Sequence, residues 1–493
     1  MQAFNPYLPN YEYVPDGEPH VFDDRLYVYG SHDRFNGEKF CMNDYVCWSA
    51  PVDDLKDWRY EGVIYKKIQD PANPEGDKVM YAPDVAQGPD GRYYLYYGLA
   101  DQYKINVCVC DKPAGEYVYY GCVTHADGTP WGEKDTDFMP FDPGILVDDG
   151  RIHLYAGQGP MFLNQVEDDK ARRFRDSAYY VELEPDMKTI RRGPIRLLPN
   201  CGESEGTGFE KHEFFEANSI RKFNGKYYFI YSSVQSHELV YAVSDRPDGG
   251  FIYGGTLHSN GDIFSDNGVQ ISFFNGPSPY IKAYIGNNHG SIAYVKGHYY
   301  IFGHRQTNAS MFSRQGVAEE IFMDENGHFT QAEMTSCGLN GGPLEGRGTY
   351  SAAICCLLQS KIGACVSHPL AQTEEHPRLT QDGPDREQDP GQYIANLRDG
   401  AMAAFKYFDF ETNTPAKIRV QVRGSAKGEL VVYDAEEAEE PIARIPLDLE
   451  TEDWTLEEAP IRAAGAKTPL FFRYKGSGAL DLYSFTLEEP IDG

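Results

Sequence analysis

Short stretches in which large apolar side chains alternate along the chain recur five times, each directly after a Gly or Asp turn. They occupy residues 24–30, 91–98, 150–157, 225–232 and 297–304, and successive turns lie between 59 and 75 residues apart. A turn followed by such a stretch is typical of the second arm of a β-hairpin. Because side chains of a strand point alternately to its two faces, each stretch presents aromatic residues on both faces of a sheet. The pattern therefore predicts five similar all-β units.

Five units of this size indicate a five-bladed β-propeller over residues 1–335. Each unit is long enough for about four short strands, which is one blade. A single blade cannot cover both of its own faces, whereas blades arranged around an axis pack on one another. The alternative is an ordinary run of β-hairpins in a sandwich, which does not require nearly constant spacing. The propeller is the better account of the repeat.

An ionisable residue lies seven to nine positions before the turn of every repeat. These residues are Asp16, Asp84, Asp142, Glu216 and His289. Equivalent positions of successive blades surround the central axis, so the innermost strands would bring four carboxylates and one imidazole to one mouth of the channel. An Asp beside Gly or Pro is also a common turn former. Turn formation alone does not explain the matched offset in all blades.

Glu216 stands out because it lies within an apolar strand, between Phe214-Phe215 and Ala217. Burial in such a strand raises the pKa of a carboxyl group, as a general acid requires at neutral pH. Glycoside hydrolysis needs one ionised carboxylate that activates water and one protonated carboxyl that donates to the leaving oxygen. A third carboxylate beside the acid would keep it protonated and orient it. The cluster therefore points to glycoside hydrolysis.

Composition and charge narrow the classes of partner. The chain has 493 residues with Tyr 36, Phe 27 and Gly 49, which favours short strands and tight turns over helices. Its 75 acidic and 45 basic residues give a net charge of −30, which works against binding to nucleic acid or to an anionic membrane surface. A neutral small molecule, such as an oligosaccharide, is the favoured partner. The sequence does not indicate an oligomeric state.

The ten cysteines and the first residues bear on location. Several cysteines lie within apolar runs and no CxxC pair occurs, so we expect reduced core cysteines rather than a zinc site. The first residues lack a basic segment followed by an apolar one, and no run of 18 apolar residues occurs. We therefore expect a cytoplasmic protein without a transmembrane helix, with a trimmed secreted protein as the alternative.

Five segments together resemble glycoside hydrolase family 43. They are Pro15-Asp16-Gly17-Glu18-Pro19, Tyr81-Ala82-Pro83-Asp84-Val85, Phe141-Asp142-Pro143, the run from Phe214 to Lys222, and Asn287-Asn288-His289-Gly290. The resemblance implies a five-bladed propeller and an inverting hydrolase of arabinosyl or xylosyl substrates. An inverting enzyme holds its base and acid roughly 6.5–9.5 Å apart, which leaves room for a water.

The resemblance also implies a role for individual residues. Asp16 resembles the general base, Glu216 the general acid, and Asp142 the carboxylate that positions and tunes that acid. His289 resembles an axial histidine that supports a structural Ca²⁺ through water, and no organic cofactor is implied. Four further side chains are expected to contact the sugar: Asp84, Arg305, and the aromatic Phe35 and Phe215, for which ordinary core packing is the alternative.

The C-terminal part, residues 336–493, is predicted to be a β-sandwich of jelly-roll type. An acidic, Pro-containing segment over 367–392 indicates a long loop, and short alternating strands are expected at 404–410, 416–422, 428–433, 443–447, 469–474 and 479–487. The segments 394–410 and 470–485 resemble a family 6 carbohydrate-binding module. Two roles are open for this module: it binds sugar, or it only covers the flank of the propeller and has lost sugar binding.

Three functions are compatible with these residues. The first is an exo-acting α-L-arabinofuranosidase that acts on oligosaccharides derived from arabinoxylan or arabinan. The second is a β-D-xylosidase, or an enzyme with both activities, because the two sugars present similar hydroxyl patterns. The third is a sugar-binding propeller without catalysis, which would not need three carboxylates at matched offsets. The carboxylates favour an enzyme, and the overall resemblance favours arabinofuranose.

Overall fold

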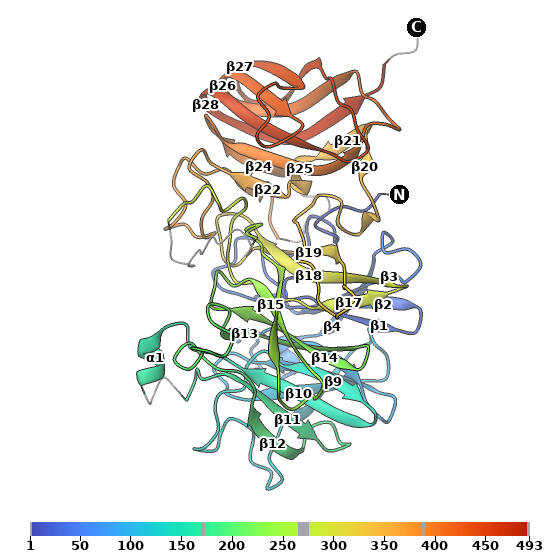
Figure 1. The fold of residues 1–493 in the computed structure, drawn as a ribbon, viewed down its shortest axis with the longest axis vertical. Helices are drawn as coiled ribbons and strands as arrows, with labels where there is room; N and C mark the ends of the chain where they lie inside the picture. Colours follow the sequence, from blue (N-terminus) through green and yellow to red (C-terminus); the bar gives the residue numbers. More distant parts are fainter. Residues whose placement is uncertain (1, 169–172, 265–275, 386–390, 491–493) are drawn as a thin grey trace.

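The computed structural model describes residues 2–168, 173–264, 276–385 and 391–490. Five small antiparallel sheets surround an axis, and a larger sheet formed by the C-terminal third lies against them (Figure 1). The predicted all-β architecture, a propeller followed by a sheet domain, is confirmed. None of the helices in the described ranges is both long and apolar enough to cross a membrane.

The blades follow one another along the chain. Blade 1 contains β1 (Glu18–Phe22), β2 (Arg25–Tyr29), β3 (Tyr45–Pro51) and β4 (Arg59–Tyr65). Blade 2 contains β5 (Asp84–Gln87), β6 (Tyr93–Gly98), β7 (Ile105–Cys110) and β8 (Val118–Cys122). Blade 3 contains β9 (Gly144–Asp148), β10 (Arg151–Gly157), β11 (Ala178–Leu183) and β12 (Ile190–Arg196), with the short helix α1 (Leu163–Glu167) in its β10–β11 loop. Blade 4 contains β13 (Phe214–Phe223), β14 (Lys226–Ser233), β15 (Leu239–Ser244) and β16 (Ile252–His258). Blade 5 contains β17 (Ile292–Val295), β18 (His298–Gln306) and β19 (Arg314–Ile321).

The repeated aromatic stretches form the second strand of every blade, namely β2, β6, β10, β14 and β18. Their side chains fill the spaces between neighbouring blades. Tyr29 and Tyr45 of blade 1, for example, share one cluster with Tyr97 of blade 2, and each of these three side chains is fully buried. Burying one large apolar side chain contributes about 1.5–3 kcal/mol. The repeated aromatic side chains thus form the hydrophobic contacts between neighbouring blades.

Blade 5 differs from the expected four strands, since the described residues supply it with three. Its open edge is covered by the N-terminal segment, because the Asn5 side chain exchanges hydrogen bonds with the backbone of Ala318 at 3.0 Å in each direction. A parallel bridge between Gly17 and Gly290 joins blade 5 to blade 1 at the axis. A Cβ on Gly290 would lie 1.8 Å from the carbonyl oxygen of Phe302, so only glycine fits at this closure.

The C-terminal sheet joins β20 (Leu344–Glu345), β21 (Gly348–Ser351), β22 (Leu357–Gln359), β23 (Arg378–Gln381), β24 (Gln392–Leu397), β25 (Met402–Asp409), β26 (Lys417–Tyr433), β27 (Ala443–Pro460) and β28 (Thr468–Glu488). Short 3₁₀ turns occur at Lys67–Gln69, Gly338–Asn340 and Ala352–Ile354. The sheet curls over a large core, so that β26–β28 form one layer and β22, β24 and β25 the other (Figure 1). The strands predicted at 416–422 and 428–433 are parts of the single long strand β26, and those at 469–474 and 479–487 are parts of β28.

The predicted domain boundary at residue 335 falls between β19 and β20. The long loop predicted over 367–392 contains β23 and also residues 386–390, which lie outside the described residues. Resemblance of this part to a carbohydrate-binding module stays a prediction.

The segment around β23 also contacts loops of the propeller. The Asp385 carboxylate accepts hydrogen bonds from the Phe35 backbone N–H at 2.7 Å and from the Asn43 side chain at 2.9 Å. The backbone N–H of Asn308 donates to the Leu379 carbonyl at 2.7 Å. The C-terminal sheet therefore braces two propeller loops, one after β2 and one after β18.

Candidate active site

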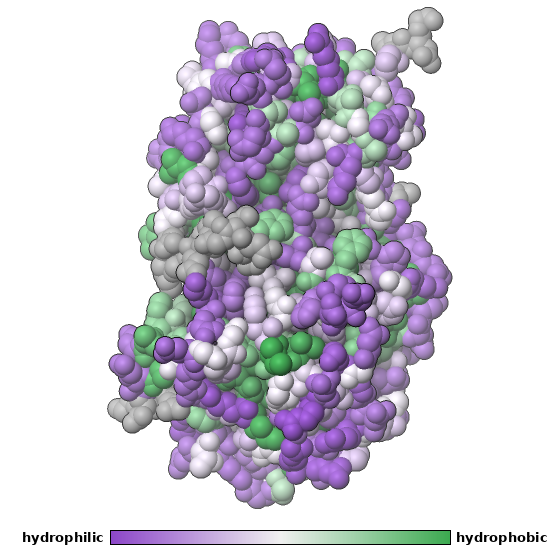
Figure 2. Space-filling model, viewed as in Figure 1, coloured by the Kyte–Doolittle hydropathy of each residue, from purple (hydrophilic) through white to green (hydrophobic). Residues whose placement is uncertain are grey.

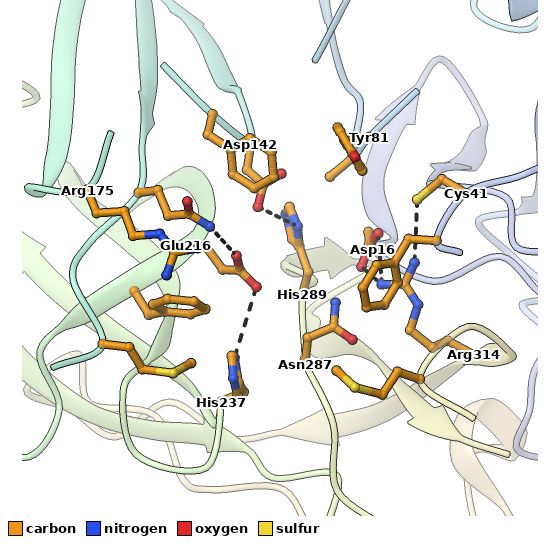
Figure 3. Close-up of a pocket in the computed structure, with 17 residues that line it drawn as sticks. Asp16, Cys41, Tyr81, Asp142, Arg175, Glu216, His237, Asn287, His289 and Arg314 are labelled. Carbon is orange, nitrogen blue, oxygen red and sulfur yellow. Dashed lines mark hydrogen bonds and ion pairs between the residues drawn. The ribbon is translucent and has the colours of Figure 1, made fainter. Parts of the chain in front are cut away.

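A cavity of about 260 Å³ opens at the mouth of the propeller channel. Asp16, Asp142, Glu216, His289 and Phe215 all line it (Figure 3). In each blade the first strand starts at this mouth and the second strand returns to it, so the loop after the second strand also lies there. These loops supply further lining residues, including Cys41, Gln158, His237 and Met311. Five of the eight residues singled out from the sequence thus meet in one pocket.

Unusual local backbone conformations place the three candidate catalytic carboxylates at the mouth of the channel. Asp16 and Asp142 stand two residues before β1 and β9, and both have left-handed φ angles of 58° and 47°. Glu216 lies inside β13, but the pairing of β13 with β14 is irregular on both sides of it and Ala217 has a φ of 67°. Such strained conformations persist where the surrounding structure fixes them, and they concentrate at functional sites.

Asp16 is held as an ionised carboxylate. Its Oδ1 accepts a hydrogen bond from Nη1 of Arg314 at 3.0 Å, and both side chains are buried. Its backbone N–H donates to Nδ1 of His304 at 3.3 Å, while Nε2 of His304 donates to the Asn287 carbonyl at 2.6 Å. Burial alone would raise the pKa of Asp16, but Arg314, His304, His289 and a hydrogen bond from Ser31 together outweigh it, so the pKa lies below its usual value. An ionised carboxylate is what a general base requires.

Arg314 is itself fixed by a second carboxylate. Its Nε and Nη2 bind the two oxygens of Asp33 at 2.8 and 2.9 Å, and Asp33 is fully buried. The guanidinium also lies 4.8 Å from the ring centre of Phe40. Because Nε and Nη2 are both bound to Asp33, the guanidinium is fixed with Nη1 toward Asp16. This contact sets the position of the Asp16 carboxylate.

Glu216 and Asp142 form the opposite, protonated side of the site. Burial raises the pKa of Asp142 to about 8; His289 opposes this rise, while Glu216 adds to it. Burial likewise raises the pKa of Glu216, against a hydrogen bond of 3.0 Å that Gln158 donates to its Oε2. Two neighbouring carboxyl groups repel each other's charge, so the pair retains a proton near neutral pH. Asp142 also accepts a hydrogen bond from the Ala217 N–H at 3.1 Å and so anchors the chain next to Glu216.

His289 lies between the pocket and the channel below it. Its Nδ1 is 3.8 Å from Asp142 Oδ2, and its Nε2 is 3.5 Å from Glu18 Oε1. Burial would lower the pKa of His289, but Glu18, Asp142 and Asp16 together raise it to about 9. His289 is therefore a cation at neutral pH that attracts the carboxylates on both of its sides.

Comparison with known proteins is consistent with this arrangement. The sequence pattern of the glycosyl hydrolases family 43 matches residues 12–249. A xylosidase/arabinosidase of Thermoclostridium stercorarium is 48% identical over 99% of this chain and 99% of its own length. The chain belongs to glycosyl hydrolase family 43. A β-xylosidase of Xylanibacter ruminicola is 27% identical over 64% of this chain and 96% of its own length. The fold of the family 43 protein resembles that of a Bacillus subtilis arabinoxylan arabinofuranohydrolase, with a TM-score of 0.51 at 18% identity over 99% of this chain and 97% of that one.

The channel of this family 43 hydrolase contains donors that fit a cation. Ligand atoms of Glu18, His20 and Asp84 lie within 4.8 Å of one another. Glu18 Oε1 and His289 Nε2 are buried without a hydrogen-bond partner among the described residues. The other Glu18 oxygen accepts a hydrogen bond from Arg221 at 2.7 Å. Two carboxylates and bound water would suit Ca²⁺, which prefers oxygen ligands.

Asp84 lies in this channel and not in the pocket. It is the first residue of β5, as Glu18 is of β1, whereas Asp16 and Asp142 precede their strands by two residues. Its fully buried carboxylate contacts Nε2 of His20 at 2.6 Å and accepts a hydrogen bond from the Ile145 N–H at 2.8 Å. Two positions along a strand thus move a carboxylate from the sugar pocket to the axis.

The structure also places Phe35 and Arg305 outside the pocket lining. Phe35 is 4% exposed and packs on Tyr13, with the ring centres 5.7 Å apart. Arg305 donates hydrogen bonds to Gln315 and to the Cys355 carbonyl, so it faces the C-terminal part. In the adjacent strand Arg314 is paired with Gln306, the next residue after Arg305, and points to the opposite side. Phe40 of the same β2–β3 loop lines the pocket where Phe35 was expected.

Sequence reasoning did not find Arg314, Asp33 and Gln158. The signal for Arg314 is a run of three polar residues, Ser313-Arg314-Gln315, directly before the apolar centre of the strand at Gly316–Ala318. Asp33 and Gln158 lie in loops after the second strands of their blades, outside the strands that the repeat pattern defines. Their roles depend on loop conformation, which the repeat pattern does not determine.

Proposed function

We propose that this glycoside hydrolase is an inverting, exo-acting α-L-arabinofuranosidase that acts on oligosaccharides derived from arabinoxylan or arabinan. One observation carries the proposal. An ionised carboxylate, Asp16, and a carboxyl group whose pKa is raised by burial, Glu216, face each other across one small pocket (Figure 3). Family membership, which makes the protein an enzyme, argues against the alternative of a propeller that only binds sugar.

In this mechanism Asp16 accepts a proton from a water, and the water attacks the anomeric carbon from the Asp16 side. Glu216 donates its proton to the leaving oxygen on the other side of the sugar. On the acid side, Asp142 and Glu216 share a proton, because two neighbouring buried carboxyl groups do not both ionise near neutral pH. His289 balances the remaining negative charge. Arg314 keeps Asp16 ionised until Asp16 accepts the proton of the water. After the product leaves, a proton passes from Asp16 to Glu216 through solvent.

A specific observation favours a second activity, on a different terminal sugar. The relative that is 48% identical is named a xylosidase/arabinosidase, a name that covers both sugars. We therefore propose β-D-xylosidase activity as the second candidate. All ten cysteines are unpaired, which supports a reducing, cytoplasmic compartment and short oligosaccharides as substrates.

The test compares kcat/KM on an aryl α-L-arabinofuranoside with kcat/KM on an aryl β-D-xyloside. The proposal expects turnover of the arabinofuranoside at the higher kcat/KM, and a ratio strongly in favour of the xyloside would replace it by the second candidate. Glu216→Gln and Asp16→Asn should each lower kcat at least about 100-fold because each removes a proton-transfer group. Near wild-type turnover by either variant would contradict the assignment of these residues.

We also propose that a structural Ca²⁺ is held in the channel by Glu18 and Asp84, next to His289. The ion would supply positive charge below the pocket and would take no part in bond breaking. Dialysis against a chelator should lower the melting temperature, and added Ca²⁺ should restore it. In Glu18→Gln the added Ca²⁺ should have no such effect. An unchanged melting temperature after chelation would contradict a bound ion.

A further inference from the structure

Loops at the mouth of the propeller carry hydrophobic side chains that face solvent. The β6–β7 loop contains Tyr103, which is 49% exposed, and the β10–β11 loop contains Phe174, which is 37% exposed. Their rings contact each other with centres 5.0 Å apart. In the same β10–β11 loop Leu163, the first residue of α1, is 59% exposed, and Figure 2 shows hydrophobic side chains over α1. Exposed apolar side chains gathered beside a pocket indicate a binding surface.

This surface is continuous with the wall of the pocket. Met161 and Arg175, which lie close in sequence to Leu163 and Phe174, both line the pocket. The backbone also ties the loop to the pocket: the Asp176 N–H donates to the Gln158 carbonyl at 2.8 Å. Tyr103 and Phe174 therefore stand at the rim of the cavity and not on a separate face.

The rim that they form is on the side of the general acid. Gln158 donates a hydrogen bond of 3.0 Å to Glu216, and Arg175 lies beside Glu216, across the pocket from Asp16 (Figure 3). In an inverting reaction the leaving oxygen is next to the acid and the attacking water is next to the base. The part of the substrate that leaves must therefore pass the Arg175 side of the mouth.

Arg175 has hydrogen-bonding capacity available for this part of the substrate. It makes no hydrogen bond or ion pair to the residues that the structure describes, although it is half-buried. A guanidinium presents several N–H donors in a fixed plane, which suits two neighbouring hydroxyl groups. An aromatic pair beside it offers apolar faces to the C–H groups of a sugar ring.

We propose that Tyr103, Phe174 and Arg175 form the binding site for the leaving portion of the substrate, and that this portion is a neutral chain of at least two sugar units. The proposal rests on the proposed function, since it takes Glu216 as the acid. It adds that the enzyme selects its substrate by the chain to which the terminal sugar is attached. The catalytic efficiency should then rise with the number of sugar units on the leaving side.

The test measures kcat/KM on a methyl glycoside of the released sugar and on a tetrasaccharide that ends in the same sugar. In the wild-type protein the tetrasaccharide should be the better substrate. Phe174→Ala and Tyr103→Ala should each lower the ratio of the two values by about tenfold, which corresponds to about 1.4 kcal/mol. Arg175→Met should lower the ratio mainly through a higher KM for the tetrasaccharide.

Phe322→Ala is the matched control, because Phe322 is 62% exposed but follows β19 and lies outside the pocket lining. It should keep the wild-type ratio. If the Phe174 and Tyr103 variants keep the wild-type ratio, or if the control loses it equally, the inference is overturned while the catalytic assignment stands. If the wild-type protein cleaves neither substrate, the proposed function fails instead.

Discussion

Replacing Arg314 by methionine would test the electrostatic design of the base. The substitution preserves a long side chain but removes the only guanidinium shared by the buried carboxylates of Asp16 and Asp33 among the described residues. Removing one partner of a buried ion pair typically costs about 3–5 kcal/mol, because a charge remains without compensation. We therefore expect the free energy of unfolding at neutral pH to fall by about that amount. Arg314→Lys keeps the charge but not the bidentate geometry. Its free energy of unfolding should therefore lie between those of the wild type and of the methionine variant.

The same variant should change the pH dependence of catalysis. Arg314 holds the pKa of Asp16 below its ordinary value, so Asp16 stabilises the folded state above the unfolded pKa and loses this contribution as the pH falls through the folded pKa. Without Arg314 the pKa of Asp16 rises, and the acidic limb of kcat/KM should move up by about one pH unit or more. Thermal unfolding and a pH–rate profile measure the two effects. An unchanged acidic limb together with a wild-type melting temperature would refute the reasoning.

Three further substitutions test other parts of the structure. Asp142→Asn removes the carboxyl group that shares a proton with Glu216 and leaves Glu216 to ionise alone, so the basic limb of the kcat profile should move to lower pH; a limb that stays in place would contradict this role. Gly290→Ala puts a methyl group 1.8 Å from a backbone oxygen of β18 and should lower the melting temperature by several degrees, which calorimetry can measure against the wild type. Asp385→Asn weakens the hold of the C-terminal part on the β2–β3 loop and should raise KM several-fold, whereas Asp382→Asn, whose partners lie within the C-terminal sheet, should not; equal KM values would argue against the brace.

Much of the fold was predictable because it depends on repetition. Each alternating aromatic stretch marks the second strand of one blade, which packs on both of its faces. Five such stretches therefore predict five blades. The number of strands in blade 5 depends instead on which segment covers an edge, and the N-terminal residues around Asn5 do so without forming a strand. Similarly, the sequence pattern predicts two separate strands at 416–422 and 428–433, yet β26 continues through the residues between them because β27 and β28 pair with it on both sides.

The candidate site was predictable as far as strand position determines it. Asp16, Asp142, Glu216 and His289 share an offset from the repeat turns, and the structure gathers them in one pocket. Asp84 shares that offset to within one residue, but in the structure it lies two positions further along its strand than Asp16 and Asp142, which moves its side chain to the channel. Arg305 and Arg314 show the same limit, because which face of a strand a residue occupies depends on a register that the sequence pattern did not resolve.

The central claim, that Asp16 and Glu216 act as base and acid from opposite sides of one sugar, is tested most directly by the configuration of the sugar when it is first released. Proton NMR during the first minutes of hydrolysis distinguishes the two anomers before they equilibrate. An α-L-arabinofuranoside should yield the β anomer first, and a β-D-xyloside should yield the α anomer first. Release of the sugar with the configuration of the substrate would mean a covalent intermediate and would contradict the account.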